Sequence, residues 1–167
     1  MTKIKRSILF FVAFPLFLAC FILSDHVYSE PPKVFTTYYC TIHYSSETAL
    51  NDFFWRITGR RFELADDLDL AKSRVDRLVD RVQSILDMFP SDFHVNIELR
   101  DRYEEGMIAL YNRSDDNIVV YANKITDGIL AHELAHAVIN DYFVYTAPYK
   151  IQEVLAQYVD THLWTNY

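Results

Sequence analysis

Cysteine is scarce in this sequence, which contains only Cys20 and Cys40. Cys20 lies in an N-terminal segment that we expect to be removed, so Cys40 is alone in the remaining chain. No intrachain disulfide can then form, which excludes a fold held together by a disulfide framework. Cys40 lies in a strand-like run, where we expect it to be a small buried residue.

Glycine and proline are also rare, with three and five residues respectively. No linker rich in these residues divides the chain, and there is no internal repeat or low-complexity tract. Beyond residue 29, 138 residues remain. This length suffices for one compact domain and not for two. We therefore expect a single domain over residues 30–167.

Basic residues are outnumbered, with 16 lysines and arginines against 23 aspartates and glutamates, a net charge of −7. Without residues 1–29 the net charge becomes −9, because that segment contributes Lys3, Lys5 and Arg6 against Asp25. A chain this acidic is not expected to bind nucleic acid through phosphate contacts.

A long apolar run lies near the start of the chain, from Ile8 to Leu23. Three basic residues precede it within the first six positions, and Ser24 follows it. A basic start, an apolar segment and a polar exit are typical of a secretory signal peptide. We therefore expect residues 1–29 to be a signal peptide and the mature chain to begin at Glu30.

Two other interpretations of this segment stay open. The run of 16 residues could be retained as a membrane anchor, although a membrane span needs about 20 residues. Leu18-Ala19-Cys20 resembles a bacterial lipoprotein site, although Phe17 fits its first position poorly. All three interpretations predict an exported chain, whether secreted, periplasmic or membrane-tethered, with membrane contact only through this segment.

The most informative motif is His132-Glu133-Leu134-Ala135-His136, an HExxH sequence within an apolar run. A helix repeats every 3.6 residues, so the two histidines lie one turn apart on the same face. This spacing allows both imidazoles to bind one zinc ion at about 2.0–2.1 Å. Glu133 lies beside them, where it can reach a zinc-bound water without being a ligand. Thr126 or Asp127 is expected to cap this helix.

A third ligand is needed, and Glu153 is the candidate, 17 residues beyond His136. Its neighbours Ile151, Val154 and Leu155 indicate a largely buried helix. A carboxylate in such surroundings is costly unless it is paired or bound to a metal. We therefore predict a site for one Zn²⁺ with His132, His136 and Glu153 as ligands, and Asp160 is the next choice for the third position.

The segments HELAH (132–136) and PYKIQEVLAQY (148–158) resemble the peptidase-MA-like, or gluzincin, group of zinc peptidases. The match is specific over about residues 117 to 160 and weak upstream. It implies a zincin-like fold in which a Glu-bearing helix follows the HExxH helix. It also implies hydrolysis of peptide bonds by a zinc-activated water, with Glu133 as general base. In such folds the strand before the motif helix, here residues 117–122, is the sheet edge that holds an extended substrate.

The chain departs from this group in one respect. Many relatives place a glycine directly after the ligand glutamate and an aspartate four residues beyond it, whereas this chain has Val154 and Gln157. The carboxylate that would orient a zinc-binding histidine is therefore not identified. Asp160 and Asp141 are the alternatives.

An oxyanion donor usually assists this chemistry, and five residues near the motif are candidates: Tyr142, Tyr145, Tyr149, Tyr158 and His162. The expected substrate is a peptide or protein, and nothing in the sequence sets its cleavage specificity.

The main alternative to a peptidase is an exported zinc-binding module without proteolytic activity, acting in recognition or structure. Glu133 argues against it, because a purely structural zinc site needs no general base. An exported protein without a metal is the remaining alternative.

Periodicity predicts an α+β fold in which a small mixed sheet packs on helices and the zinc site lies between the last two helices. The first strand is expected over Val34–Tyr44. A helix around residues 49–57 should follow, begun by Ser45 or Ser46 and ended by Gly59. The next helix should have an apolar stripe from Leu68 to Phe89 and end at Pro90. Strands are then expected over 93–99, 107–112 and 118–123, before the motif helix and the Glu153 helix.

Overall fold

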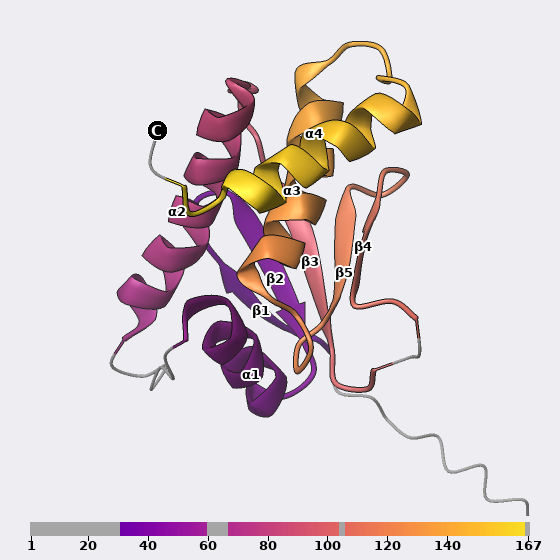
Figure 1. Cartoon of the computed structure of the whole chain (residues 1–167). Coiled ribbons are helices and arrows are strands. Elements are labelled where there is room, and N and C mark those ends of the chain that lie inside the picture. The colour runs from indigo at the N-terminus through magenta and orange to yellow at the C-terminus, as the bar shows by residue number, and fades with distance from the viewer. Residues whose placement is uncertain (1–30, 60–66, 104–105, 166–167) are drawn as a thin grey trace, which may run out of the picture.

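A computed structural model describes residues 31–59, 67–103 and 106–165 (Figure 1). The expected signal peptide, residues 1–29, lies outside the described residues. In chain order the elements are β1 (Lys33–Thr36), β2 (Cys40–Tyr44), α1 (Glu47–Thr58), α2 (Leu68–Leu86), β3 (Val95–Arg100), β4 (Ala109–Asn112), β5 (Asn117–Tyr121), α3 (Asp127–Tyr142) and α4 (Tyr149–His162).

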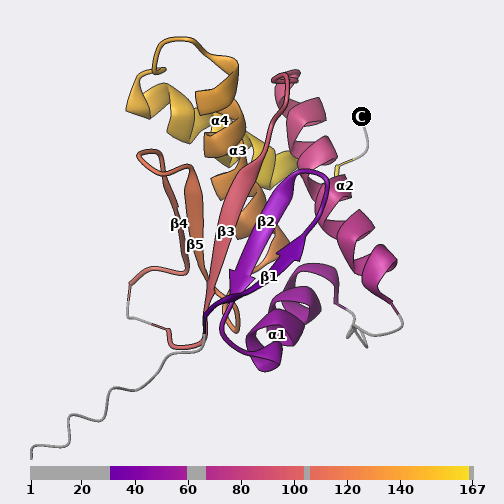
Figure 2. The same ribbon diagram turned by 180° about the vertical axis from the view of Figure 1, so that it is seen from behind.

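The five strands form one mixed sheet in the order β1-β2-β3-β5-β4. The pairs β2–β3 and β3–β5 are parallel, whereas β1 and β4 are antiparallel edge strands. The helices lie on one face of the sheet, and the other face is seen uncovered from behind (Figure 2). The expectation of an α+β fold with a small mixed sheet packed on helices is confirmed.

The expected position of the sheet edge is wrong. The strand before the motif helix, β5, lies inside the sheet between β3 and β4, so that β4 forms the edge. The reason is the tight turn after β4. It returns the chain as β5 on the inner side of β4, where β5 pairs in parallel with β3. The edge that lies beside α3 is therefore residues Ala109–Asn112.

The single strand expected over Val34–Tyr44 is also wrong, because a turn divides it into β1 and β2. The turn contains no glycine, proline, asparagine or aspartate, so it lacks the usual sequence signal. The N–H of Thr37 donates to the carbonyl of Cys40 at 2.8 Å, and the N–H of Cys40 donates to Oγ1 of Thr37 at 3.0 Å. Asp76 of α2 accepts hydrogen bonds from the two remaining backbone N–H groups of the turn. A distant carboxylate thus stabilises this turn.

The boundaries of the first two helices follow their capping residues. Ser46 caps α1 by accepting a hydrogen bond from the N–H of Ala49, and Gly59 ends α1 with φ of 66°, as expected. The second helix ends earlier than expected, at Leu86, because Asp87 adopts the left-handed conformation with φ of 53°. Phe89, the expected end of the apolar stripe, is consequently 59% exposed.

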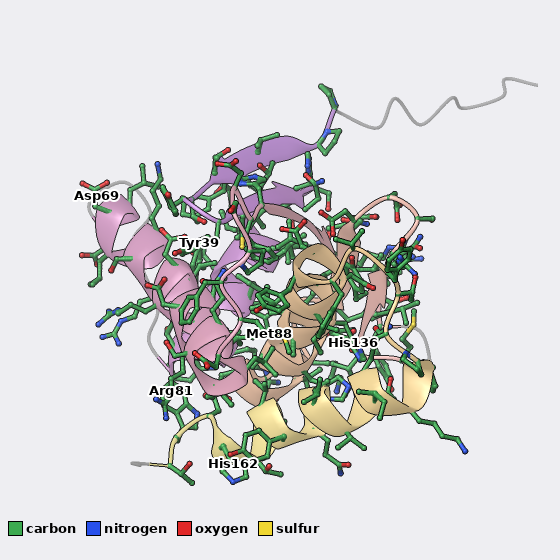
Figure 3. All side chains as sticks on the ribbon, turned by 90° about the horizontal axis from the view of Figure 1, so that it is seen from above. Tyr39, Asp69, Arg81, Met88, His136 and His162 are labelled. Carbon is green, nitrogen blue, oxygen red and sulfur yellow. The ribbon has the colours of Figure 1, made fainter. Side chains whose placement is uncertain are left out.

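The interior of the protein lies between the sheet and the helices. Strand β3 shows the expected alternation, in which Val95, Ile97 and Leu99 are buried and the intervening residues are half-buried. Helix α3 is buried along most of its length and lies between the sheet and α4 (Figure 3). This arrangement places the HExxH face of α3 between α4 and the edge strand β4. None of the helices in the described ranges is long and apolar enough to cross a membrane.

Candidate metal centre

The first turn of α3 fixes the position of the motif. Thr126 is the N-cap residue, and its hydroxyl accepts a hydrogen bond from the N–H of Ile129 at 3.2 Å. Asp127 lies in the first turn, where a carboxylate interacts favourably with the helix dipole. Of the two capping residues expected from the sequence, Thr126 is therefore the cap. From this start, His132 and His136 fall on the side of α3 that faces α4.

The structure brings the three predicted ligands together. Nε2 of His132 lies 3.3 Å from Nε2 of His136. The carboxylate oxygens of Glu153 lie 3.3 Å from Nε2 of His136 and 3.6 Å from Nε2 of His132. Zinc bonds of 2.0–2.1 Å in tetrahedral geometry require ligand atoms about 3.3 Å apart. The two imidazole nitrogens have this spacing, and a different carboxylate oxygen of Glu153 faces each of them, so the group could hold one metal ion.

The protonation of His136 also suits a ligand. The residue is buried, with 8% exposure, and burial lowers its pKa below the usual value, although Glu133 and Glu153 act in the opposite direction. A neutral imidazole offers a lone pair to a metal, whereas a protonated one does not. The facing nitrogens of His132 and His136 beside the Glu153 carboxylate form a set of donors that could hold a cation.

A glutamine lies beside His136, where we expected an aspartate to orient the ring. Gln152 of α4 is buried, and its amide nitrogen donates to the carbonyl of Ala147 at 2.8 Å. The amide oxygen accepts a hydrogen bond from the ring of His136, and this contact opposes the lowering of the pKa of His136 by burial. A partner of this kind fixes the orientation of a ligating imidazole. Sequence reasoning missed Gln152, and its only signal was a polar residue among apolar ones directly before Glu153.

The two aspartates considered for this orienting role lie elsewhere. Asp160 stands over the first turn of α3, where the carboxylate meets the position that a side chain on Gly128 would take. Burial, with Asp116 and Asp92 nearby, raises the pKa of Asp141. Within the described residues, neither Asp160 nor Asp141 makes a hydrogen bond to His132 or His136.

The glutamate of the motif contacts the sheet edge and is not part of the group of ligands. Oε2 of Glu133 accepts a hydrogen bond from the backbone N–H of Tyr111 at 2.7 Å. Tyr111 lies on β4, and this N–H points away from the neighbouring strand β5. The contact therefore holds the carboxylate between the sheet edge and the candidate metal ligands. Sequence reasoning did not identify Tyr111, because it placed the edge on β5.

These residues surround a cavity of about 500 Å³, which we call the metal-site pocket. It lies between the edge strand, α3 and the start of α4. Its lining consists of Leu110, Tyr111, Arg113, His132, Glu133, His136, Asn140, Thr146, Ala147, Tyr149, Gln152 and Glu153.

Of the five candidate oxyanion donors, Tyr149 lines this pocket and the other four do not. A hydrogen bond to Glu153 raises the pKa of Tyr149. Tyr142 and Tyr145 are 47% and 86% exposed near the α3–α4 connection. The ring of Tyr158 stacks on His162 at 3.9 Å, and His162 lies at the far end of α4 from His136 (Figure 3).

Gln152 provides a test of the orientation of His136. Replacing Gln152 with leucine should lower zinc affinity about 10- to 100-fold, because the imidazole loses its hydrogen-bond partner. Zinc titration against a competing chelator measures this change. The matched control is Gln157→Leu, since Gln157 is exposed on the same helix. Equal affinities of both variants and the parent would show that Gln152 does not orient a ligand.

Comparison with protein-family models, curated proteins and solved structures found no match to this chain. A functional assignment therefore rests on the residues of the site and their geometry.

Proposed function

We propose that this chain is an exported zinc-dependent peptidase of the gluzincin type with a zincin-like fold. The observation that supports this best is the convergence of His132, His136 and Glu153, from two packed helices, on one place where they could hold a metal ion. Glu133 is adjacent to them but lies outside the donor set. A structural site would have no need of this fourth group, whereas a hydrolytic site requires it.

The residues fit zinc by number and type. Two imidazole nitrogens and one carboxylate oxygen are a donor set found in catalytic zinc sites, which keep the fourth position open. The pocket in front of the three donors gives access to that position. When bound, zinc would polarise the scissile carbonyl and lower the pKa of water to near 7.

Glu133 would act as general base and then as general acid. Its carboxylate would accept a proton from the attacking water and deliver it to the leaving amine. The hydrogen bond from the N–H of Tyr111 involves Oε2, so Oε1 is the oxygen available for this transfer. Tyr111 thus positions the base without occupying both of its oxygens.

Strand β4 would hold the substrate in place of β5. Apart from the N–H of Tyr111, which donates to Glu133, this edge strand presents backbone groups that an extended peptide can pair with. Leu110 and Tyr111 of this strand line the metal-site pocket beside Glu133. A peptide paired along β4 would therefore pass in front of the candidate zinc ligands. We propose a peptide or protein substrate on this basis.

Two measurements on the purified protein test this function. Metal analysis should find one zinc ion per chain, and digestion of a general peptide library should stop when a chelator is added and resume with zinc. Zinc without any cleavage would favour the non-proteolytic zinc-binding module. Absence of zinc binding would contradict both.

A further inference from the structure

An arginine bounds one end of the metal-site pocket. Arg113 directly follows β4, and Nη1 of its guanidinium donates a hydrogen bond to the hydroxyl of Thr146 in the α3–α4 connection. Both residues line the pocket. No other arginine or lysine lines it among the described residues. This contact therefore fixes a positive charge at one end of the pocket, between the sheet edge and the loop before α4.

The charge of Arg113 is not neutralised by an ion pair within the described residues. The two aspartates of the same turn have other surroundings. Asp116 accepts a hydrogen bond from the hydroxyl of Tyr111 at 2.9 Å. Asp115 lines a separate depression with Glu98. The carboxylates within the pocket are held by the N–H of Tyr111 and by the two histidines.

We propose that Arg113 selects peptide substrates that carry a carboxylate close to the scissile bond, an inference that rests on the proposed peptidase function. A guanidinium presents five donors in a planar fork that can bind both oxygens of a carboxylate. The contact with Thr146 uses one nitrogen of this fork. Within the described residues its other N–H groups have no hydrogen-bond partner, so they can bind a substrate.

The position of Arg113 directly after β4 limits the distance between the selected carboxylate and the scissile bond. Arg113 lies two residues beyond Tyr111, whose N–H contacts the proposed base. At about 3.3 Å per residue, two residues of extended chain span about 7 Å. The selected carboxylate should therefore lie within about two residues of the bond that is cleaved. An acidic side chain and a free C-terminal carboxylate share this chemistry.

Quenched fluorescent peptides can identify the carboxylate. In the first set the ends are acetylated and amidated, and each position in turn is glutamate or glutamine. In the second set the glutamine peptides have a free C-terminus. We expect one of these carboxylates to raise kcat/KM about 10- to 100-fold over the matching amide peptide. A preferred peptide with an internal glutamate would show that the site selects an acidic side chain. A preferred peptide with a free C-terminus would show that it selects a terminal carboxylate.

Variants then assign the preference to Arg113. Arg113→Gln should abolish it, and Arg113→Lys should retain part of it, because lysine has the charge but not the fork. The matched control, Arg74→Gln, alters an exposed arginine of α2 that lines a different cavity and should keep the full preference. A preference that survives in Arg113→Gln, or equal cleavage of all acid and amide peptides, would overturn the inference.

The two proposals fail in different ways. If no peptide of either set is cleaved, the peptidase function fails. Binding of the same peptides to the zinc-loaded protein then tests Arg113 alone, by fluorescence anisotropy. Tighter binding of an acidic peptide that is lost in Arg113→Gln would support the carboxylate site, whereas equal binding of acid and amide peptides would overturn it.

Discussion

Replacing Glu133 with glutamine is expected to lower peptide hydrolysis about 10²–10⁴-fold, because the variant loses the group that transfers the proton. Zinc affinity should stay unchanged, since Glu133 lies outside the donor set formed by His132, His136 and Glu153. The fold should also be kept, because the glutamine oxygen can still accept the hydrogen bond from Tyr111. Steady-state cleavage and zinc titration of the same preparation measure both quantities.

Glu98→Gln is the matched control for this experiment. Glu98 is a glutamate of β3 whose carboxylate pairs with Arg100 at 3.1 Å, away from the metal-site pocket. Its substitution should leave the cleavage rate unchanged. Hydrolysis by Glu133→Gln at the parental rate would show that Glu133 is not the base. Loss of zinc in this variant would instead move Glu133 into the set of ligands.

The second large effect is expected for Glu153→Ala, which should weaken zinc binding by more than about 100-fold. Removing a partner of a ligand already costs about 10- to 100-fold, and this change removes one of three protein ligands. The variant should also gain less thermal stability from zinc than the parent, because metal binding stabilises only the state that it binds. The remaining two histidines lie on one helix and cannot tie α3 to α4.

Calorimetric zinc titration and thermal unfolding with and without zinc measure these changes. Glu98→Ala controls for the loss of a carboxylate, and Asp160→Ala tests the alternative third ligand directly. We expect both controls to bind zinc like the parent. If Glu153→Ala bound zinc normally and Asp160→Ala did not, the assignment of the third ligand would change to Asp160.

The part of the site that sequence reasoning placed well is local. The relative positions of His132, Glu133 and His136 follow from helical periodicity alone. Glu153 was chosen because Ile151 and Val154 beside it predicted a largely buried helix, and that reason is wrong, because these two residues are 51% and 64% exposed. The caps Ser46, Thr126 and Gly59 likewise act on neighbouring backbone groups.

The part that sequence reasoning missed depends on contacts between distant segments. The order of the strands depends on which strands pair, and nothing in the residues of β5 shows that β4 lies outside it. The turn between β1 and β2 depends on Asp76, which lies more than thirty residues away. The contacts of Gln152 with His136 and of Tyr111 with Glu133 require the packing of α4 and β4 against α3.

The placement of the ligands on α3 and α4 has a consequence for the order of folding. All three candidate ligands lie within residues 132–153, on two consecutive helices, whereas the pairing of β2 with β3 joins Cys40 to Val95. Contacts between residues close in sequence form faster than contacts that close a long loop. The helical hairpin can therefore capture a metal ion before the sheet is complete. Glu133 gains its contact with Tyr111 only when β4 has joined the sheet, so metal binding would precede catalytic competence during folding.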